Sequence, residues 1–193
     1  YETVMYICEN AEYYPCYDEF SAYDRDIGET GLPMVGAGDA PFHTWLADMT
    51  GYEKGYLDLF DYPQKVERLL ETMTQVYRER MWPVVAQSPA RLILHGTHFS
   101  TQTTPASYYD RYITPYMKEF TDYMHAHGKK VTQHADNDSQ RILDQLKDSG
   151  YDMQECFVTA PMVPCTLEEA RASWGTSMII WGGVPSTILE EDF

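Results

Sequence analysis

The chain has 193 residues, of which 44% are hydrophobic and 23% charged, so its composition is that of a globular protein and excludes disordered and fibrous classes. Thirty acidic against fourteen basic residues give a formal net charge of −16, which would repel nucleic-acid phosphates and an anionic membrane. No stretch approaches the roughly 20 apolar residues of a membrane span. We therefore expect a small-molecule substrate, and neither nucleic acid nor a membrane as a partner.

The four cysteines are too few and too scattered to form a disulfide framework. They are expected to be reduced thiols, which favours a cytoplasmic protein. The N-terminus has neither a starting methionine nor a basic-then-apolar signal peptide, so we expect a chain cut from a longer protein.

The first thirty residues differ in pattern from the rest. Residues 2–11 have the apolar spacing of a helix, and residues 13–31 form a segment rich in tyrosine and aspartate that we interpret as a loop. No repeat or low-complexity linker divides the chain. We expect one domain over residues 1–193, with this helix-and-loop extension over 1–30 and βα units over 31–193.

From residue 31 onward, short apolar runs alternate with helical periods. Strands are predicted at 34–37, 91–95, 129–133, 153–159 and 178–181. Helices are predicted at 63–81, from 104 to a stop at Gly128 with a kink near Pro115, at 139–149, and from a capping box at Thr166–Glu169 to Gly175. This alternation is typical of an α/β protein with a parallel sheet.

In such proteins, functional groups gather just beyond the carboxyl ends of the strands. The candidate catalytic residues are Asp39 and His98, and the candidate substrate-binding residues are Phe42, His43, His95, Gly182 and Gly183. Each also has a structural interpretation. Asp39 lies in a glycine-rich turn, the two histidines of the second strand end have no evident partner, and the glycine pair also suits a tight turn.

The third strand end carries the pattern His134-x-Asp136, which places two ligand-type side chains on one face because residues i and i+2 of a strand point the same way. Imidazole and carboxylate suit Zn, Fe or Mn, and a thiolate from Cys165 would favour Zn. Alternatively, His134 is a hydrogen-bonded buried histidine and Asp136 caps the next helix. Cys156, in the middle of a predicted strand, is expected to pack in the core.

Several segments, taken in order, resemble the uroporphyrinogen decarboxylase superfamily. They are the turn Ala40-Pro41-Phe42, the stretches 51–63 and 104–118, the run His127 to His134, and the stretches 167–175 and 180–184. The resemblance extends from about residue 30 to the end. It implies a (β/α)8 TIM-type barrel, present here as an incomplete barrel that lacks N-terminal and C-terminal strands.

The superfamily contains cofactor-free porphyrinogen decarboxylases and zinc-dependent methyltransferases that serve corrinoid proteins or coenzyme M. The decarboxylases' substrate tyrosine falls at Ala47, and their Glu-Ser-x-Ala-Gly segment at Thr97–Thr101, so both are changed. The methyltransferases' His-x-Cys zinc motif falls at His134-Ala135-Asp136, where the histidine is kept and the cysteine becomes aspartate.

The resemblance therefore favours a methyltransferase that moves a methyl group from a small, for example methoxylated, substrate to a corrinoid protein or a thiol. It implies a zinc ion, with a corrinoid carried by a partner protein. Two alternatives remain: a uroporphyrinogen decarboxylase of tetrapyrrole and heme biosynthesis, which needs no cofactor, and a non-catalytic small-molecule-binding barrel. Because an incomplete barrel leaves open sheet edges, we expect either that the native protein contains the missing strands or that a partner chain, for example a second copy in a homo-oligomer, covers the edges.

Overall fold

A computed structural model describes residues 1–190 of the chain, so residues 191–193 of the predicted domain lie outside the described residues. Five strands form one parallel sheet in the order β1-β2-β3-β4-β5. They are β1 (Met34–Gly36), β2 (Leu92–Thr97), β3 (Lys130–His134), β4 (Met153–Phe157) and β5 (Ile179–Gly182). The parallel α/β arrangement predicted from the sequence is confirmed, with all five strands near their predicted positions.

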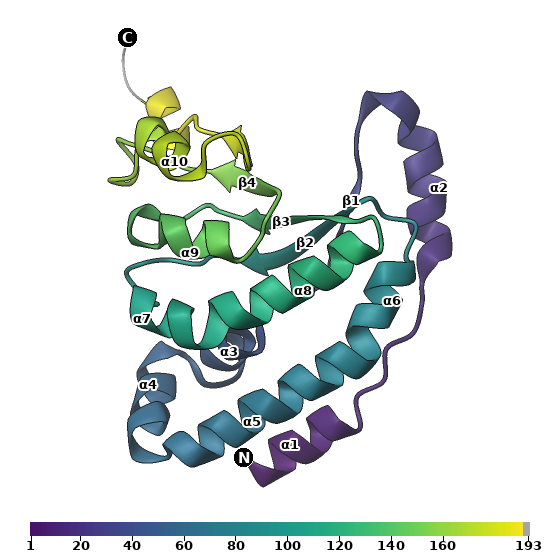
Figure 1. The fold of residues 1–193 in the computed structure, drawn as a ribbon, viewed down its shortest axis with the longest axis vertical. Helices are drawn as coiled ribbons and strands as arrows, with labels where there is room; N and C mark the ends of the chain where they lie inside the picture. The colour runs from purple at the N-terminus through teal and green to yellow at the C-terminus, as the bar shows by residue number, and fades with distance from the viewer. Residues whose placement is uncertain (191–193) are drawn as a thin grey trace.

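Helices connect the strands and pack in a layer beside the sheet (Figure 1). They are α1 (Glu2–Glu9), α2 (Tyr17–Ile27), α3 (Pro41–His43), α4 (Tyr52–Asp61), α5 (Pro63–Val76), α6 (Trp82–Gln87), α7 (Ala106–Tyr108), α8 (Thr114–Ala126), α9 (Leu143–Asp148) and α10 (Leu167–Trp174). Helix α8 contacts β3 and lies between α6 and α9, while α1 packs on the outside of α5.

The core lies between the sheet and this helical layer. The apolar face predicted for the helix at 63–81 is buried in α5, through Val66, Leu69, Leu70, Met73 and Val76. Each such side chain contributes about 1.5–3 kcal/mol when fully buried. The capping box at Thr166–Glu169 is also present, with each side chain bonded to the other residue's backbone N–H.

Two helix predictions need correction. Residues 17–27, predicted as a loop, form α2. No residue of this helix is fully buried, and its half-buried face mixes the apolar Tyr17, Phe20 and Ile27 with the polar Ser21 and Asp24, which interrupts the apolar pattern. The acidic residues Asp18 and Glu19 in its first turn and Arg25 in its last turn instead complement the helix dipole. The helix at 63–81 does not stop at Met81, because a π-helical turn joins α5 to α6.

At the predicted kink near Pro115, the structure again has a π-helical turn, like the one between α5 and α6. A π-helical turn at Tyr109–Ile113 joins α7 to α8, and Pro115 lies in the first turn of α8, where a proline is tolerated because its missing N–H has no helical partner. Gly128 then adopts a φ of +73° just past the end of α8, as a helix-stopping glycine does.

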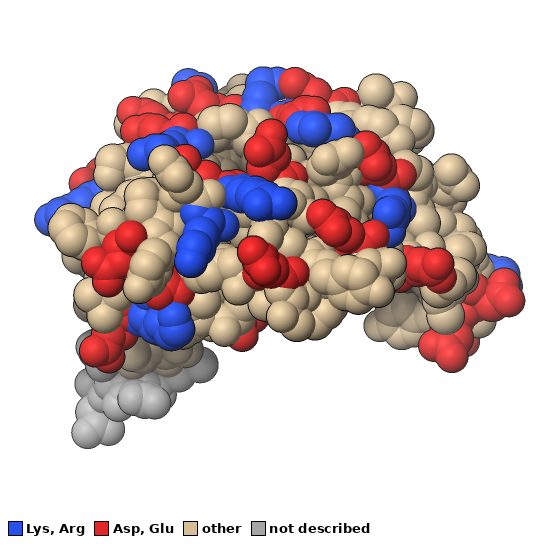
Figure 2. All heavy atoms as spheres, turned by 90° about the horizontal axis from the view of Figure 1, so that it is seen from below, with Lys and Arg blue, Asp and Glu red and all other residues tan. Residues whose placement is uncertain are grey.

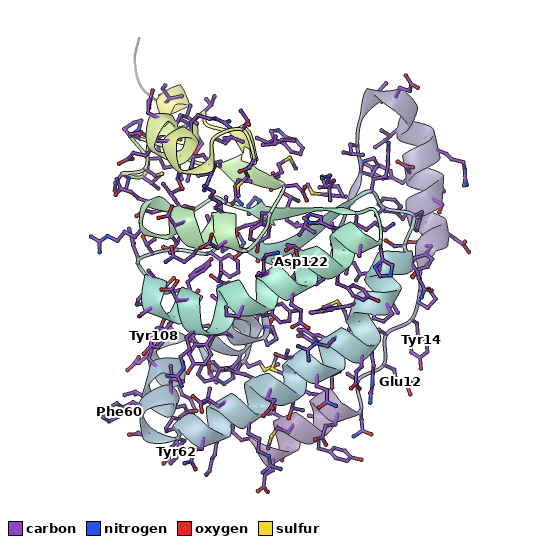
Figure 3. The ribbon with its side chains drawn as sticks, viewed as in Figure 1. Glu12, Tyr14, Phe60, Tyr62, Tyr108 and Asp122 are labelled. Carbon is purple, nitrogen blue, oxygen red and sulfur yellow. The ribbon has the colours of Figure 1, made fainter. Side chains whose placement is uncertain are left out.

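The second face of the sheet and its edges are less covered. In the described residues, β1 and β5 are the edge strands, and the β5 side chains Ile179 and Trp181 are more than half exposed. Figure 3 shows two further exposed aromatic residues, Phe60 and Tyr62, at the outer end of α4. Among residues 1–190, no helix combines the length and the apolar character needed to cross a bilayer.

The negative charge does not collect in one patch on the face that carries α1, α4 and α5. Figure 2 shows this face with lysine and arginine side chains lying among the aspartates and glutamates. Ion pairs such as Arg78–Glu119, with 2.6 Å between Nη2 and Oε2, account for part of this mixing. The unusual groupings of polar residues lie elsewhere, at the ends of the strands.

Candidate metal centre

The candidate site lies where β2, β3 and β4 end, at the arrowheads of Figure 1. The strand register places Thr97 beside His134 and His134 beside Glu155, so these residues form one row across three strands. Their side chains lie on the less covered face of the sheet, where His134 is 27% and Glu155 18% exposed. The sheet therefore brings His134, a predicted ligand, next to Thr97 and Glu155 at the carboxyl ends of its strands.

Four side chains at these strand ends form a continuous chain of contacts, in the order His98, Asp136, His134 and Glu155. His98 Nδ1 lies 2.8 Å from Asp136 Oδ1 and 2.9 Å from Oδ2, and Asp136 Oδ2 lies 3.5 Å from His134 Nε2. On its other side, the Nδ1 atom of His134 is hydrogen-bonded to Glu155. Each histidine is thus held by a carboxylate, and His134 lies between two of them.

Two overlapping groups have the composition of a metal site. One ligand atom from each of His98, His134 and Asp136 lies within 4.8 Å of the others, and the same holds for His134, Glu155 and Cys156. His134 belongs to both groups. Imidazole, carboxylate and thiolate together suit Zn²⁺, which takes four such ligands at about 2.0–2.3 Å.

The backbone is strained at both sides of this cluster. Among the described residues, the non-glycine residues with positive φ are His98, at +54°, and Cys156, at +55°. Cys156 lies within a shift of strand register between Glu155 and Phe157, and His98 directly follows a strand whose register shifts between Leu94 and Thr97. Bulges of this kind re-aim side chains next to active sites, and a left-handed non-glycine residue costs about 1–2 kcal/mol.

Cys156 is exposed, so the expectation that it packs in the core is wrong. In a regular strand, Cys156 would share the face of the buried Gln154, but the bulge between Glu155 and Phe157 breaks this alternation. Partial burial and the negative charges of Glu155 and Asp136 raise the pKa of the Cys156 thiol.

Cys165, the predicted thiolate ligand, is fully buried, and its Sγ atom lies 3.8 Å from the carbonyl oxygen of Thr166. Burial, with smaller contributions from Glu169 and Asp138, raises the pKa of its thiol to about 11. Within residues 1–190 it belongs to neither ligand group. The structure thus brings a different cysteine to His134.

Asp39 joins the loop after β1 to the end of β2. Its Oδ1 atom accepts a hydrogen bond from the Thr97 backbone N–H at 2.7 Å, and its Oδ2 atom accepts one from Thr97 Oγ1 at 2.8 Å. Burial raises the pKa of Asp39, but His43 and Thr97 more than offset this, so the pKa lies below its usual value. The carboxylate is therefore ionised and fixes the residue that precedes His98.

Three predicted substrate-binding residues are buried rather than open to the site. Phe42 stacks on Tyr112 with ring centroids 4.7 Å apart, and the His43 ring lies 4.7 Å from that of Phe99. His95 turns towards the helical layer, where its ring lies 4.1 Å from that of Phe120, and its Nδ1–H donates to the carbonyl of Ala37, just after β1, at 3.1 Å. The structure does not bring these side chains to the His134 cluster.

His95 is fully buried and neutral. Burial lowers its pKa to about 4, which leaves its Nε2 free to accept a hydrogen bond from the Tyr116 hydroxyl at 3.2 Å. Trp82 donates to the same hydroxyl at 3.2 Å. These contacts match the structural interpretation of His95 that the sequence left open.

Gly182 and Gly183 allow β5 to approach β4 closely. A Cβ atom on Gly182 would lie 2.6 Å from the Phe157 backbone nitrogen, and Gly183 donates a backbone hydrogen bond to the Phe157 carbonyl at 2.6 Å. Both have positive φ, which glycine adopts without steric cost. Their geometry matches the tight-turn interpretation.

Sequence reasoning missed Glu155 and Cys156. Glu155 becomes a neighbour of His134 only through the register of β3 and β4, and Cys156 reaches the cluster only through a bulge. A single sequence contains no signal for either feature, because both depend on how strands pair.

The fold and the cluster define an α/β protein whose polar site lies at the carboxyl ends of parallel strands. The family model described as "Uroporphyrinogen decarboxylase (URO-D)" matches residues 14–192, and the chain belongs to this family. The resemblance found in the sequence is therefore confirmed, and it begins earlier than residue 30.

Among solved structures, the chain is similar to a methyltransferase from Methanosarcina mazei, with a TM-score of 0.57 and 13% sequence identity. The match covers 89% of this chain and 54% of the other, so the chain spans about half the length of that structure. At this identity the likeness is one of fold. No curated protein sequence gives a significant match.

Proposed function

We propose that the chain forms part of a (β/α)8 barrel that transfers methyl groups with the help of a metal ion, held at the carboxyl ends of its strands. The observation that carries this proposal is the cluster around His134, where imidazoles, carboxylates and a thiol lie within ligand range of one another. The five parallel strands and the fold of the similar methyltransferase support the barrel. Open edges at β1 and β5 would be covered by further strands or by a second copy of the chain.

Zinc is the ion that this donor set suits, although Fe and Mn accept the same imidazoles and carboxylates. When bound, such an ion acts as a Lewis acid on a methyl donor, or binds an acceptor thiol and lowers its pKa. The methyl donor would be a small, for example methoxylated, molecule, and the acceptor a thiol or a corrinoid on a partner protein.

The chain's own residues have separate roles in this proposal. With a methoxylated donor, the methyl group would leave its oxygen for the acceptor, and the released oxygen would take up a proton. His98 is placed to supply that proton, because its side chain is 60% exposed and Asp136 holds its Nδ1 atom. Asp39 would position His98 through its two hydrogen bonds to Thr97.

Porphyrinogen decarboxylation remains the family's other activity, but the electrostatics of the cluster oppose it. Porphyrinogens carry several carboxylates, which cationic side chains must hold. Here the carboxylates of Asp136 and Glu155 face the site, and Asp39 lies beside it. These negative charges would repel an anionic substrate rather than bind it.

The test is a methyl-transfer assay with zinc-loaded protein, cob(I)alamin or a thiol as acceptor, and a panel of small methoxylated donors. We expect methylcobalamin or a methyl thioether to form, and the His134→Ala variant to be inactive. A parallel incubation with uroporphyrinogen should yield no coproporphyrinogen. Porphyrinogen turnover without methyl transfer would overturn the proposal, as would a protein that binds no metal and transfers no methyl group.

A further inference from the structure

The two ligand groups compete for His134, because each uses a different nitrogen of its ring. The Nε2 atom lies on the side of Asp136, and the Nδ1 atom lies on the side of Glu155. A single ion binds one of these nitrogens. The identity of the first-sphere ligands therefore depends on which side of the ring the ion occupies.

We propose that the ion binds Nδ1 of His134 together with the Glu155 carboxylate and the Cys156 thiolate, and that Asp136 is a positioning residue rather than a ligand. This assignment rests on the proposed function and names the ligands of its metal. It replaces the predicted thiolate of Cys165 with that of Cys156, which the bulge of β4 supplies.

The geometry of the β4 side supports the assignment. Donor atoms of one ion with bonds of about 2.0–2.3 Å lie roughly 3–4 Å apart. One ring nitrogen of His134, one Glu155 carboxylate oxygen and the Cys156 thiol lie within 4.8 Å of one another, and it is the Nδ1 atom that contacts Glu155. The hydrogen bond between His134 and Glu155 occupies the place that the ion would take.

The other side of the ring faces a carboxylate, that of Asp136, 3.5 Å from Nε2. A histidine bound to a metal usually donates its second ring N–H to a carboxylate, which fixes the tautomer and the ring orientation. Asp136 lies 3.5 Å from Nε2 of His134 and is held in turn by His98 at 2.8 Å. This carboxylate is thus placed to support a ligand rather than to serve as one.

The backbone at Cys156 supplies an independent argument. Cys156 has a φ of +55°, a conformation that lowers stability for a cysteine but not for a glycine. Backbone strain of this kind persists at functional sites. In residues 1–190, the exposed Cys156 thiol takes part in no hydrogen bond with another side chain or the backbone. A metal bond would account for a strained residue whose side chain otherwise has no partner.

Cobalt(II) tests the assignment, because a thiolate bound to cobalt gives a charge-transfer absorption in the near ultraviolet that nitrogen and oxygen ligands do not. We expect the protein to bind one cobalt ion with this absorption. Cys156→Ser should abolish the absorption, whereas Cys165→Ser and the exposed control Cys16→Ser should keep it. Cys156→Gly should also abolish it, and this variant relieves the positive φ, so its loss of signal cannot be ascribed to misfolding.

The Asp136→Asn variant separates a positioning residue from a ligand. It should keep the charge-transfer absorption and bind cobalt about 10–100-fold more weakly, as removal of an outer-sphere carboxylate does. Cobalt affinity unchanged in Asp136→Asn would overturn the positioning role. A charge-transfer absorption that survives in Cys156→Ser, or that disappears in Cys165→Ser, would overturn the ligand assignment while leaving the proposed function intact. Failure of the unmodified protein to bind cobalt or zinc would overturn both.

Discussion

The two ends of the sheet both pair histidines with aspartates, but they use these pairs differently. At the amino-terminal ends, Asp152 accepts hydrogen bonds from His125 at 2.7 Å, from Lys130 at 2.7 Å and from the Val131 backbone N–H at 2.9 Å. Burial raises the pKa of Asp152, but these three donors more than offset it and lower the pKa. One carboxylate is therefore matched by several donors.

At the carboxyl-terminal ends the balance between hydrogen-bond donors and acceptors is reversed. His134 lies between Asp136 and Glu155, a free thiol lies beside them, and the backbone is strained at His98 and Cys156. Acceptors outnumber donors there, and a cation would restore the balance. In parallel α/β proteins the amino-terminal end serves stability and the carboxyl-terminal end serves function. The hydrogen bonds at the two ends differ in the way that this division predicts.

The largest effect should come from removing the histidine that both ligand groups share. His134→Ala should weaken zinc binding by more than the roughly 10–100-fold that loss of an outer-sphere group costs. The matched control is His125→Ala, which removes a histidine paired with an aspartate at the opposite end of the sheet and should leave zinc binding unchanged. Zinc content after dialysis and a competition titration measure both. Equal losses in the two variants would contradict the division between the ends.

His95, which belongs to neither group of polar residues, should make the free energy of unfolding depend on pH. The pKa of His95 is lowered by burial from 6.5 to about 4, so between these values the unfolded chain binds a proton that the folded protein does not. The free energy of unfolding should therefore fall as the pH falls through this window, by about 3 kcal/mol in total. Urea unfolding at a series of pH values measures it. His95→Asn should flatten the profile, and a variant with the same slope would show that His95 is not its source.

Removing one aspartate from each end should show that the amino-terminal end contributes more to the stability of the metal-free protein than the carboxyl-terminal end does. Asp152→Ala leaves Lys130, His125 and a backbone N–H without their acceptor and should lower the free energy of unfolding by about 1–3 kcal/mol. Asp136→Ala should change it by less than about 0.5 kcal/mol, because its partners are partly exposed. Chemical denaturation of the metal-free protein measures both. A larger loss in Asp136→Ala would reverse the assignment of the two ends.

The smallest effect concerns backbone strain. His98→Gly should raise the stability of the metal-free protein by up to about 1 kcal/mol, since relief of the positive φ outweighs the added flexibility of the unfolded chain. His127→Gly, at a φ of −99°, is the control and should lower stability. Thermal unfolding compares the two. A lower melting temperature for His98→Gly would mean that the His98–Asp136 pair contributes more than the strain costs.

Much of the fold could be predicted because it depends on local patterns. Short apolar runs such as Leu92–Leu94, of which Leu92 and Ile93 are buried, identify central strands, and the spacing of apolar residues over 63–76 identifies α5. Helix α2 could not be found in this way, because its half-buried face mixes the apolar Tyr17, Phe20 and Ile27 with the polar Ser21 and Asp24. The local pattern therefore identifies the elements that pack in the core and misses those that do not.

The site was predictable only in part, for a different reason. His134, Asp136 and His98 could be located because they follow strands in a parallel sheet, where strand ends converge. Glu155 and Cys156 depend on the register of β3 with β4 and on a bulge, which arise from pairing between distant segments. Cys165 has the right residue type in the right loop, but its side chain is buried. Residue type and loop position do not determine where a side chain points.

The strand order has a consequence for how the chain folds during its synthesis. Each strand pairs with the strand that precedes it along the chain, from β1 through β5. No described strand waits for a partner that the ribosome has yet to release, so each βα unit can add to the growing sheet as it emerges. The three strands that carry the cluster are consecutive, and His134 meets Glu155 and Cys156 only once β4 has docked. Under the proposed ligand assignment, metal capture would therefore begin only after this fourth strand has joined the sheet.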